Sequence, residues 1–411
     1  MNGPIKLMVP LVAALTIAAC SSSGSAVPGA PGSTSSQVPM SHMIPTSRMP
    51  QWMARGLAQP ACPQVTGIPT CLALVESKSG ISPTVAGWAP TDFQTRYALP
   101  SSTKGTGQVV AIVDAYDNPN VASDLAEYRS EFSLGTANFT KYNQEGQTSN
   151  YPSGSVGWGV EIDLDVDMVS AVCPKCTIYL IEANSSSSSD LDAADQEAVA
   201  LGAHIVSNSW ICYDSNSCVD PSAFSAKGVT FLAASGDAGY NNNGNPESLA
   251  SVISVGGTVL SKSGSKYNEA VWDGAGGGCS SNGGSSGVVK PSWQKDPDCT
   301  YRTDSDVSAV AWDVAEYDTY GYGGWFTVGG TSVASPMTAG VIALAGNAAK
   351  LNAGQGFWKL KNKKKKKDFN DITTGDDGSC SGEYLCQAGT GQFGIYSGPS
   401  GWGTPHGTKA Y

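Results

Sequence analysis

The segment GGTSVASP, residues 329–336, places a serine where a loop meets a long helix-forming run. Backbone N–H groups are unpaired at such a junction, and the positive end of the helix dipole lies there, so a developing oxyanion or alkoxide is stabilised. Ser332 therefore has the setting of a nucleophile, provided that a base lies near it.

The chain has three histidines, and none of them suits the role of that base. His42 lies in a leader rich in Ser, Pro and Met, and we interpret it as incidental. His204 lies in the apolar run AHIVSNSW, which predicts a buried strand, and we interpret it as structural. His406, in PHGT, is similar to the HGT of subtilisins, but it follows the serine, whereas the subtilisin histidine precedes it. A carboxylate is the alternative base.

Two carboxylates stand four residues apart in GVEIDLDVDMVSAV, residues 159–172. Glu161 and Asp165 would share one face of a helix, while Asp163 and Asp167 would point elsewhere. Like charges held close together resist double ionisation, which raises one pKa and suits general acid and base catalysis at low pH. On spacing alone, a solvated acidic helix face is the alternative.

A third acid follows an apolar strand in FLAASGDAGY, residues 231–240. In parallel α/β sheets, functional sites assemble where the strands end. A protonated Asp237 at such a strand end can donate a hydrogen bond into an oxyanion hole. The alternative is an ordinary Asp-Gly turn.

Taken in order, the Glu and Asp pair, SGDxG and GTSxxxP resemble the sedolisin family, the serine-carboxyl peptidases, which are similar to subtilisins with glutamate in place of histidine. The resemblance covers roughly residues 86–411 and includes QVVAIVDAYDNPN, AHIVSNSW and VISVGGT. It implies that Ser332 is the nucleophile, Glu161 the general base and later acid, Asp165 its orienting partner and Asp237 the oxyanion donor. It also implies a secreted endopeptidase that works through an acyl-enzyme at acidic pH.

Asp114, in VAIVDAYDNP, follows a predicted strand in the way that the subtilisin catalytic aspartate does. In the sedolisin family the acid partner is the one beside the glutamate. We therefore interpret Asp114 as structural.

The resemblance also implies one structural Ca2+, for which half of the ligand pattern is present. Asp371 and Ile372 in FNDITTG match its first part, and Gly389 and Gly391 match its glycine pair. The final aspartate is missing: direct counting gives Phe393 at its position, and allowing an insertion gives Ser397. Neither offers a carboxylate, and calcium prefers six to eight oxygen ligands. Calcium binding by this set is a hypothesis.

The composition is that of one large exported domain, with 411 residues, 49 glycines and 14% charged residues. A chain of this length can bury a substantial core in a single domain. Its net charge of −11 argues against general nucleic-acid binding. We expect a monomer that acts on protein or peptide substrates.

Eleven cysteines are present, and ten remain when Cys20 is set apart. An even number is typical of a disulfide-bonded exported protein, although connectivity cannot be deduced from sequence. Pairing of neighbours along the chain would join Cys62 with Cys71, Cys173 with Cys176, Cys212 with Cys218, Cys279 with Cys299, and Cys380 with Cys386. A redox role for CPKC is the alternative for one pair, but no thioredoxin-like context surrounds it.

The N-terminus has the pattern of a bacterial lipoprotein signal, because Lys6 precedes LMVPLVAALTIAA and Cys20 follows it. This apolar run is short for a membrane span, and small residues before the cysteine suit cleavage and lipidation. An ordinary signal peptide is the alternative. We divide the chain into a lipoprotein-type signal peptide over 1–20, a flexible tether and short N-terminal segment over 21–85, and a peptidase domain over 86–411. The expected location is the cell surface, the outer membrane or the extracellular space.

From Gln108 onward, apolar strand runs alternate with helical runs, which implies a parallel sheet covered by helices. Helices are expected near 161–172 and 190–201. Another is expected over 335–351, with Pro336 in its first turn. The alternation and the resemblance together predict an α/β, subtilisin-like three-layer fold with a mostly parallel central sheet flanked by helices.

Two further features bear on function. The lysine-rich run KNKKKKK, residues 361–367, is interpreted as an exposed, mobile loop, with docking on an anionic membrane or polymer as the alternative. A short segment separates Cys20 from the core, whereas the resemblance to the sedolisins implies a large N-terminal folding segment.

Together with the incomplete calcium pattern, this difference leaves an alternative function: a catalytically inactive surface binding protein on a peptidase fold.

Overall fold

The computed structural model describes residues 50–65, 67–78, 80–213, 218–280, 288–378 and 382–411. The predicted signal peptide, Cys20, His42 and Cys380 lie outside the described residues. Within these ranges, no helix combines the length and apolar character that crossing a membrane requires.

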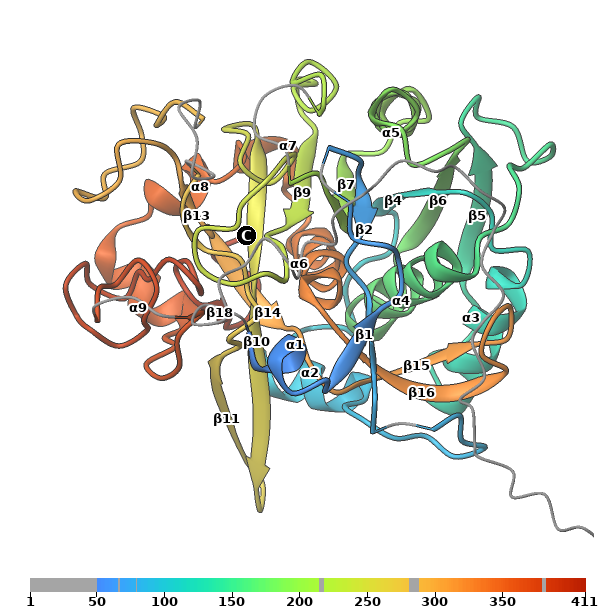
Figure 1. Ribbon diagram of the computed structural model, residues 1–411, viewed down its shortest axis with the longest axis horizontal. Helices are drawn as coiled ribbons and strands as arrows, with labels where there is room; N and C mark the ends of the chain where they lie inside the picture. Colours follow the sequence, from blue (N-terminus) through green and yellow to red (C-terminus); the bar gives the residue numbers. More distant parts are fainter. Residues whose placement is uncertain (1–49, 66, 79, 214–217, 281–287, 379–381) are drawn as a thin grey trace, which may run out of the picture. The chain divides into compact units, whose positions relative to one another are not determined.

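A mostly parallel eight-stranded sheet forms the middle layer of the fold (Figure 1). Its strands follow the order β11-β10-β9-β7-β4-β6-β5, and β14 pairs with β10. Among the described strands of this sheet, only β11 runs antiparallel to its neighbour. Their bounds are β4 (Val109–Ala115), β5 (Asn138–Asn143), β6 (Thr177–Ala183), β7 (Ile205–Asn208), β9 (Thr230–Ala234), β10 (Val252–Ser263), β11 (Lys266–Val271) and β14 (Val307–Val310).

Helices cover both faces of this sheet. Successive residues of a strand point to opposite faces, so Ile112 of β4 joins the core beneath α4 (Val156–Val172) and α6 (Thr331–Ala345). Val113, the next residue, joins the core beneath α5 (Ser188–Ala200). The predicted three-layer α/β fold is confirmed.

The remaining elements surround these layers. A second sheet, antiparallel throughout, has the order β1-β3-β16-β15, and three two-stranded sheets complete the set. The bounds are α1 (Gln51–Ala54), α2 (Pro90–Arg96), α3 (Val121–Glu131), α7 (Ala348–Leu351), α8 (Gln355–Trp358), α9 (Asn362–Asp368), β1 (Ala58–Pro60), β2 (Thr70–Cys71), β3 (Leu74–Glu76), β8 (Trp210–Ile211), β12 (Gly278–Cys279), β13 (Thr303–Asp304), β15 (Val314–Asp318), β16 (Gly324–Gly329), β17 (Phe369–Asn370) and β18 (Thr404–Pro405).

Helix α4 is buried on every side over most of its length. Glu161, Asp163, Asp165 and Asp167 are each no more than 1% exposed. The alternative interpretation of this segment as a solvated acidic helix face is therefore wrong. The four carboxyl groups lie in the interior because α3, α6 and β15 pack around the helix.

Helix α6 begins earlier and ends earlier than the sequence indicated. It begins at Thr331 after Gly330, whose φ of 111° favours glycine, and it ends at Ala345 before the left-handed Gly346. Pro336 therefore lies in the second turn and not in the first. Proline has no N–H to give the carbonyl four residues earlier, that of Ser332. The hydroxyl oxygen of Ser209 lies 3.4 Å from that carbonyl oxygen.

The lysine run is helical, and one of its members is buried. It forms α9, in which Lys365 is 5% exposed. The Lys365 ammonium donates to the carbonyl of Trp358 at 3.2 Å and lies 3.1 Å from the ring centroid of Trp402. The run is therefore a helix and not a loop; its other residues are exposed as expected, while a cation–π contact holds Lys365 inside.

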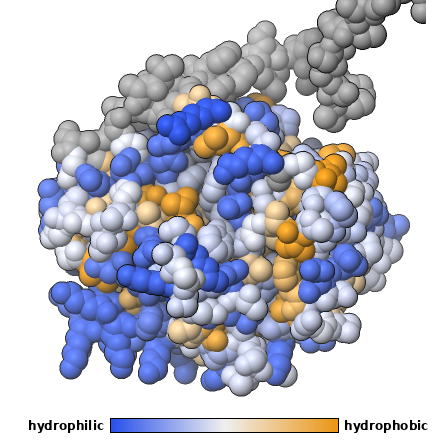
Figure 2. All heavy atoms as spheres, turned by 90° about the horizontal axis from the view of Figure 1, so that it is seen from below, coloured by the Kyte–Doolittle hydropathy of each residue, from blue (hydrophilic) through white to orange (hydrophobic). Residues whose placement is uncertain are grey.

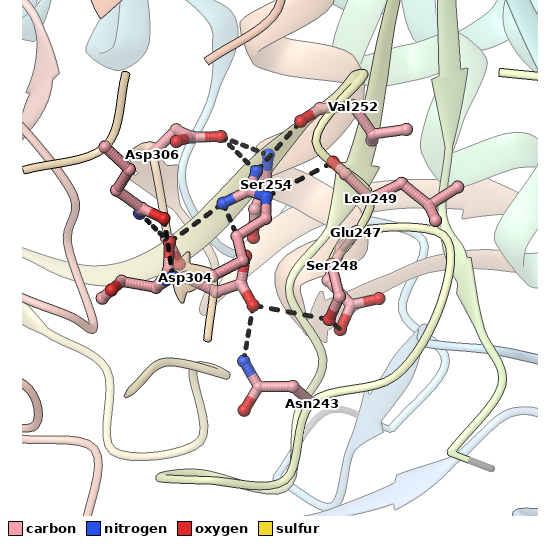
Figure 3. A network of polar contacts seen from close by, with 12 residues as sticks. Asn243, Glu247, Ser248, Leu249, Val252, Ser254, Asp304 and Asp306 are labelled. Atoms are coloured by element: carbon pink, nitrogen blue, oxygen red, sulfur yellow. Dashed lines mark hydrogen bonds and ion pairs between the residues drawn. The ribbon is translucent and has the colours of Figure 1, made fainter. Parts of the chain in front are cut away.

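A buried polar network links the loop before β10 to β13 and its flanking residues; Figure 3 labels Leu249, Val252, Asp304 and Asp306 among its members. Arg302 pairs with Asp304 at 2.9 Å and with Asp306 at 2.7 Å. It also donates to the carbonyl oxygens of Leu249 and Val252. Removing one partner of such a buried pair typically costs about 3–5 kcal/mol, so these segments are held firmly.

Four disulfides match the pairing of neighbours along the chain. They join Cys62 with Cys71, Cys173 with Cys176, Cys212 with Cys218, and Cys279 with Cys299. The fifth expected pair includes Cys380, which lies outside the described residues.

On the face that Figure 2 shows, hydrophobic residues form separate patches between hydrophilic ones, as is normal for a protein surface.

We predict that the protein becomes less stable as the pH rises from about 4 to about 7. Burial raises the pKa of Asp318 to about 6, of Asp237 to about 7 and of Asp114 to about 8. The folded chain therefore keeps protons that the unfolded chain has already lost, and each retained proton lowers the free energy of unfolding by about 1.4 kcal/mol per pH unit.

Urea unfolding of the Ser332→Ala protein, which avoids self-digestion, measures this slope. Asp318→Asn removes one of the titrating groups and should make the slope shallower between about pH 4 and 6. Stability that rises over this range would contradict the prediction.

Candidate active site

The four predicted site residues come from three elements that meet at the carboxyl end of the sheet (Figure 1). Glu161 and Asp165 lie on α4, Ser332 lies in the first turn of α6, and Asp237 follows β9. Each is no more than 2% exposed. The contacts described below bring all four together around Ser209, Thr331 and a segment from the N-terminal part of the chain.

Ser332 and Glu161 face one another. Burial raises the pKa of Glu161 well above its ordinary value, the nearby Asp114 adds to this, and the Ser332 hydroxyl opposes it. The hydroxyl itself donates to the Ser209 carbonyl at 3.4 Å. Glu161 Oε1 has no hydrogen-bond partner among the described residues. In its ionised form, Glu161 could accept the serine proton at this free oxygen.

Ser209 connects the nucleophile to the second carboxyl group. It directly follows β7, and its hydroxyl donates to Asp165 Oδ1 at 2.7 Å. Burial raises the pKa of Asp165 well above its ordinary value, and the charges of Asp114 and Glu161 raise it further. Ser209 was not singled out from the sequence, although it stands in the run AHIVSNSW.

Asp114 forms a third carboxyl group in the same cluster. It lies near the end of β4, and neither of its oxygens has a hydrogen-bond partner among the described residues. Burial raises its pKa to about 8, and its charge raises the pKa of both Glu161 and Asp165. The interpretation of Asp114 as merely structural overlooked this electrostatic link. Its place at a strand end was the signal available in the sequence.

Asp237 is held at the start of α6 with one oxygen unpaired. Its Oδ1 accepts hydrogen bonds from the Thr331 backbone N–H at 2.8 Å and from the Thr331 hydroxyl at 2.9 Å. Oδ2 has no partner among the described residues, and a Cβ on Gly330 would lie 2.8 Å from it. Burial raises the pKa of Asp237 to about 7, so below this pH the acid carries a proton that it can donate.

The first turn of α6 supplies further donors. The Ser332 N–H has no acceptor within the helix because the helix begins one residue earlier. Together with a protonated Asp237, it forms a pair of donors suited to a developing oxyanion.

An N-terminal segment also enters this site. Glu161 Oε2 accepts hydrogen bonds from the backbone N–H groups of Leu72 at 2.7 Å and Ala73 at 2.6 Å. The indole of Trp52 donates to the Asp237 carbonyl at 2.9 Å. Sequence reasoning gave these residues no role, since β2 and β3 are too short to show a periodic pattern.

The described histidines make no contact with the serine. His406 is exposed, and its Nδ1 lies 3.2 Å from Asn370 Oδ1. His204 is also exposed, because β7 begins one residue after it. The expectation that His204 lies inside the strand is therefore wrong.

The implied calcium ligands do not make a complete site. Asp371 is exposed and is the only carboxylate of the set, while Ile372 is buried among apolar side chains. Gly389 packs against the carbonyl of Thr373, and a Cβ on Gly391 would have no neighbour within 4 Å. Ile372, Gly389 and Gly391 could offer only backbone carbonyl oxygens, and the set has no second carboxylate, so calcium binding by these residues stays a hypothesis.

A different group of acids could hold a metal ion. Asp124, Asp163 and Asp318 are buried, and each offers a carboxylate oxygen within 4.8 Å of the others. It is the one such group among the described ranges, and it does not overlap with the implied calcium ligands. Its three residues belong to α3, α4 and β15, and Asp163 is two residues from Glu161 on α4.

Comparison with known proteins agrees with this geometry. Residues 105–361 match the subtilase family. Sedolisin from Pseudomonas sp. (strain 101) is 28% identical over 360 residues, which cover 78% of this chain and 60% of that protein. Kumamolisin from Bacillus sp. (strain MN-32) is 27% identical over 346 residues, which cover 74% of this chain and 60% of that protein. The chain thus matches about 60% of the length of these relatives.

A solved structure supports the same assignment. Pseudomonas sedolisin, a serine-carboxyl proteinase complexed with two molecules of pseudo-iodotyrostatin, superposes with a TM-score of 0.64 at 26% identity, covering 79% of this chain and 96% of that one. The chain belongs to the subtilase family, and within it the predicted resemblance to the sedolisins is confirmed.

Proposed function

We propose that the protein is an acid-active serine-carboxyl endopeptidase, which hydrolyses peptide bonds through an acyl-enzyme on Ser332. The observation that carries this proposal is a buried serine in the first turn of a helix close to Glu161, whose Oε1 has no hydrogen-bond partner among the described residues. Membership of the subtilase family supports the reaction class.

The proposed cycle assigns one task to each side chain. Glu161 takes the proton of Ser332 as the serine attacks the scissile carbonyl carbon, and it later gives that proton to the leaving amine. Asp165 keeps Glu161 in the required protonation state. Asp237 and the Ser332 N–H stabilise the oxyanion. Water then attacks the acyl-enzyme and repeats the sequence.

We further propose that the chain is exported and acts as a monomer on protein or peptide substrates. The four described disulfides support an oxidising environment. This proposal also includes the division of the chain into a lipoprotein-type signal over 1–20, a tether and N-terminal segment over 21–85 and a peptidase domain over 86–411. It further includes lipidation of Cys20.

Ser332→Ala and Glu161→Gln should each lower acid proteolysis of a denatured protein by at least about 10³-fold, because one removes the nucleophile and the other its base. The measurement is proteolysis from about pH 2 to 8. Ser335→Ala is the matched control, since this buried serine hydrogen-bonds only to Ser207 at 2.9 Å among the described residues. Full activity in Ser332→Ala would contradict the mechanism, whereas inactivity of folded wild type would favour a binding protein.

Activity should decline as the pH rises through about 7, because Asp237 then loses the proton that it donates. Asp237→Ala should lower kcat by about 10²–10³-fold. Asp237→Asn keeps an N–H donor and should retain more activity than the alanine variant. A pH optimum well above neutrality in the wild type would contradict this role for Asp237.

Asp114→Asn should leave kcat/KM unchanged well below pH 8, where Asp114 is protonated and uncharged, and should shift the profile to lower pH only near and above its pKa of about 8, where its charge raises the pKa of Glu161 and Asp165. The amide preserves the shape of the side chain, so the melting temperature at acidic pH should change little. An unchanged profile would restore the purely structural interpretation of Asp114.

A further inference from the structure

Three buried carboxyl groups meet where α3, α4 and β15 pack against one another (Figure 1). Asp124 lies on α3, Asp163 on α4 and Asp318 at the end of β15, and each offers a carboxylate oxygen within 4.8 Å of the other two. Ca2+ binds oxygens at about 2.3–2.6 Å, so two ligands on opposite sides of the ion lie about 5 Å apart. The spacing of the three oxygens is therefore compatible with one shared ion.

Hydrogen bonds orient two of these carboxyl groups and leave one oxygen of each free. Asp163 Oδ2 accepts a hydrogen bond from the side-chain amide of Asn118 at 2.7 Å, while Oδ1 has no partner among the described residues. Asp318 Oδ1 accepts a hydrogen bond from the Tyr320 N–H at 2.5 Å, while Oδ2 has no partner in the same described ranges. Carboxylates that bind metals are commonly oriented in this way by an outer hydrogen bond.

The third carboxyl group, that of Asp124, is held by Thr319. The Thr319 N–H donates to Asp124 Oδ2 at 2.9 Å, and the Thr319 hydroxyl donates to Oδ1 at 2.7 Å. Because the two oxygens of a carboxylate carry about four lone pairs, these hydrogen bonds leave Asp124 able to bind a cation as well. Thr319 directly follows Asp318, so the contact also ties α3 to the end of β15.

A fourth acid, Glu316, lies outside this group of three and points toward it. Glu316 is fully buried, and neither of its carboxylate oxygens has a partner among the described residues. It precedes Asp318 by two residues on β15, so both side chains lie on the same face of the strand, the face toward α4. Burial raises the pKa of Glu316 well above its ordinary value, and the nearby charges of Asp163 and Asp318 raise it further. Glu316 thus brings two more free oxygens close to the group.

These four acids have no positive partner in the described part of the chain. None of the ion pairs there involves any of them. A buried carboxylate is costly unless a cation or a metal ion balances it. Arg302 does this for Asp304 and Asp306 elsewhere in the interior. A divalent cation would supply the missing positive charge between α3, α4 and β15.

We infer that Asp124, Asp163 and Asp318 form a binding site for one Ca2+ ion, with Glu316 as a fourth carboxylate ligand. Glu316 can bind through both of its oxygens, and water completes the six to eight oxygens that Ca2+ takes. The site shares no residue with the implied calcium ligands around Asp371, and it does not depend on the proposed peptidase function.

Such an ion would support the scaffold of the candidate active site and take no part in the reaction. Helix α4 carries Glu161 and Asp165, and β15 pairs with β16, which leads to Ser332 in the first turn of α6. An ion bound to α3, α4 and β15 would hold these elements together. We therefore expect Ca2+ to increase the stability of the folded chain.

The test is a calorimetric titration of the full-length Ser332→Ala protein, which avoids self-digestion, with Ca2+ after removal of metal by a chelator. The pH is held near 7, because metal ligands bind in their deprotonated form. Binding heat and a higher melting temperature are expected, since an ion that binds only the folded state stabilises it. Neither effect at up to about 10 mM Ca2+, above the dissociation constants of about 10⁻⁴–10⁻³ M of weak extracellular sites, would overturn the inference.

Variants in the same background identify the residues that bind the ion. Asp163→Asn, Asp318→Asn and Glu316→Gln should each weaken Ca2+ binding by at least about 10-fold, because each removes a negative charge and a ligand oxygen while keeping the side-chain shape. Their melting temperatures without metal establish that they are folded. Asp371→Asn is the matched control and should leave this binding unchanged. Unchanged affinity in Asp163→Asn and Asp318→Asn, or loss of all binding in Asp371→Asn, would refute the assignment.

Discussion

The arrangement depends on burying carboxyl groups that have no cation beside them. Glu161, Asp165 and Asp114 lie in the packed interior, and none of the ion pairs among the described residues involves them. Such groups tolerate burial by keeping a proton, since an unpaired buried charge is far more costly. The Arg302 network shows the other solution, in which a buried cation pairs with Asp304 and Asp306 (Figure 3). The proposed catalytic cluster has no such cation, so its protons are part of the structure.

Much of this architecture follows from local patterns in the sequence. Apolar runs that alternate with helical runs predicted the parallel sheet, and the sheet brings the ends of β4, β7 and β9 to one edge. The three motifs placed Glu161, Ser332 and Asp237 on the right kinds of element, because each element is long and apolar enough to be recognised. The pairing of neighbouring cysteines succeeded in the four described cases because short loops bring both partners together.

The rest depends on contacts between residues far apart in sequence. The spacing of Glu161 and Asp165 shows that they share a helix face, but it does not show what covers that face. The sequence around Lys365 predicts a surface charge, because it does not show that the distant Trp402 places its aromatic ring against the ammonium group. The short strands β2 and β3 carry no periodic signal, and they are fixed only by pairing with β8 and β16.

The segment Thr70–Ala73 acts on the pKa of Glu161 in two opposite directions. Burial raises its pKa, and the N–H groups of Leu72 and Ala73 lower it again by donating to Oε2. Both donors are backbone groups, so any extended peptide in the same position would supply them. Without this segment or a peptide in its place, water would replace these donors and would reduce the burial that raises the pKa. A bound peptide thus both excludes water and restores the hydrogen bonds that favour the carboxylate, which couples the protonation state of Glu161 to occupation of the site.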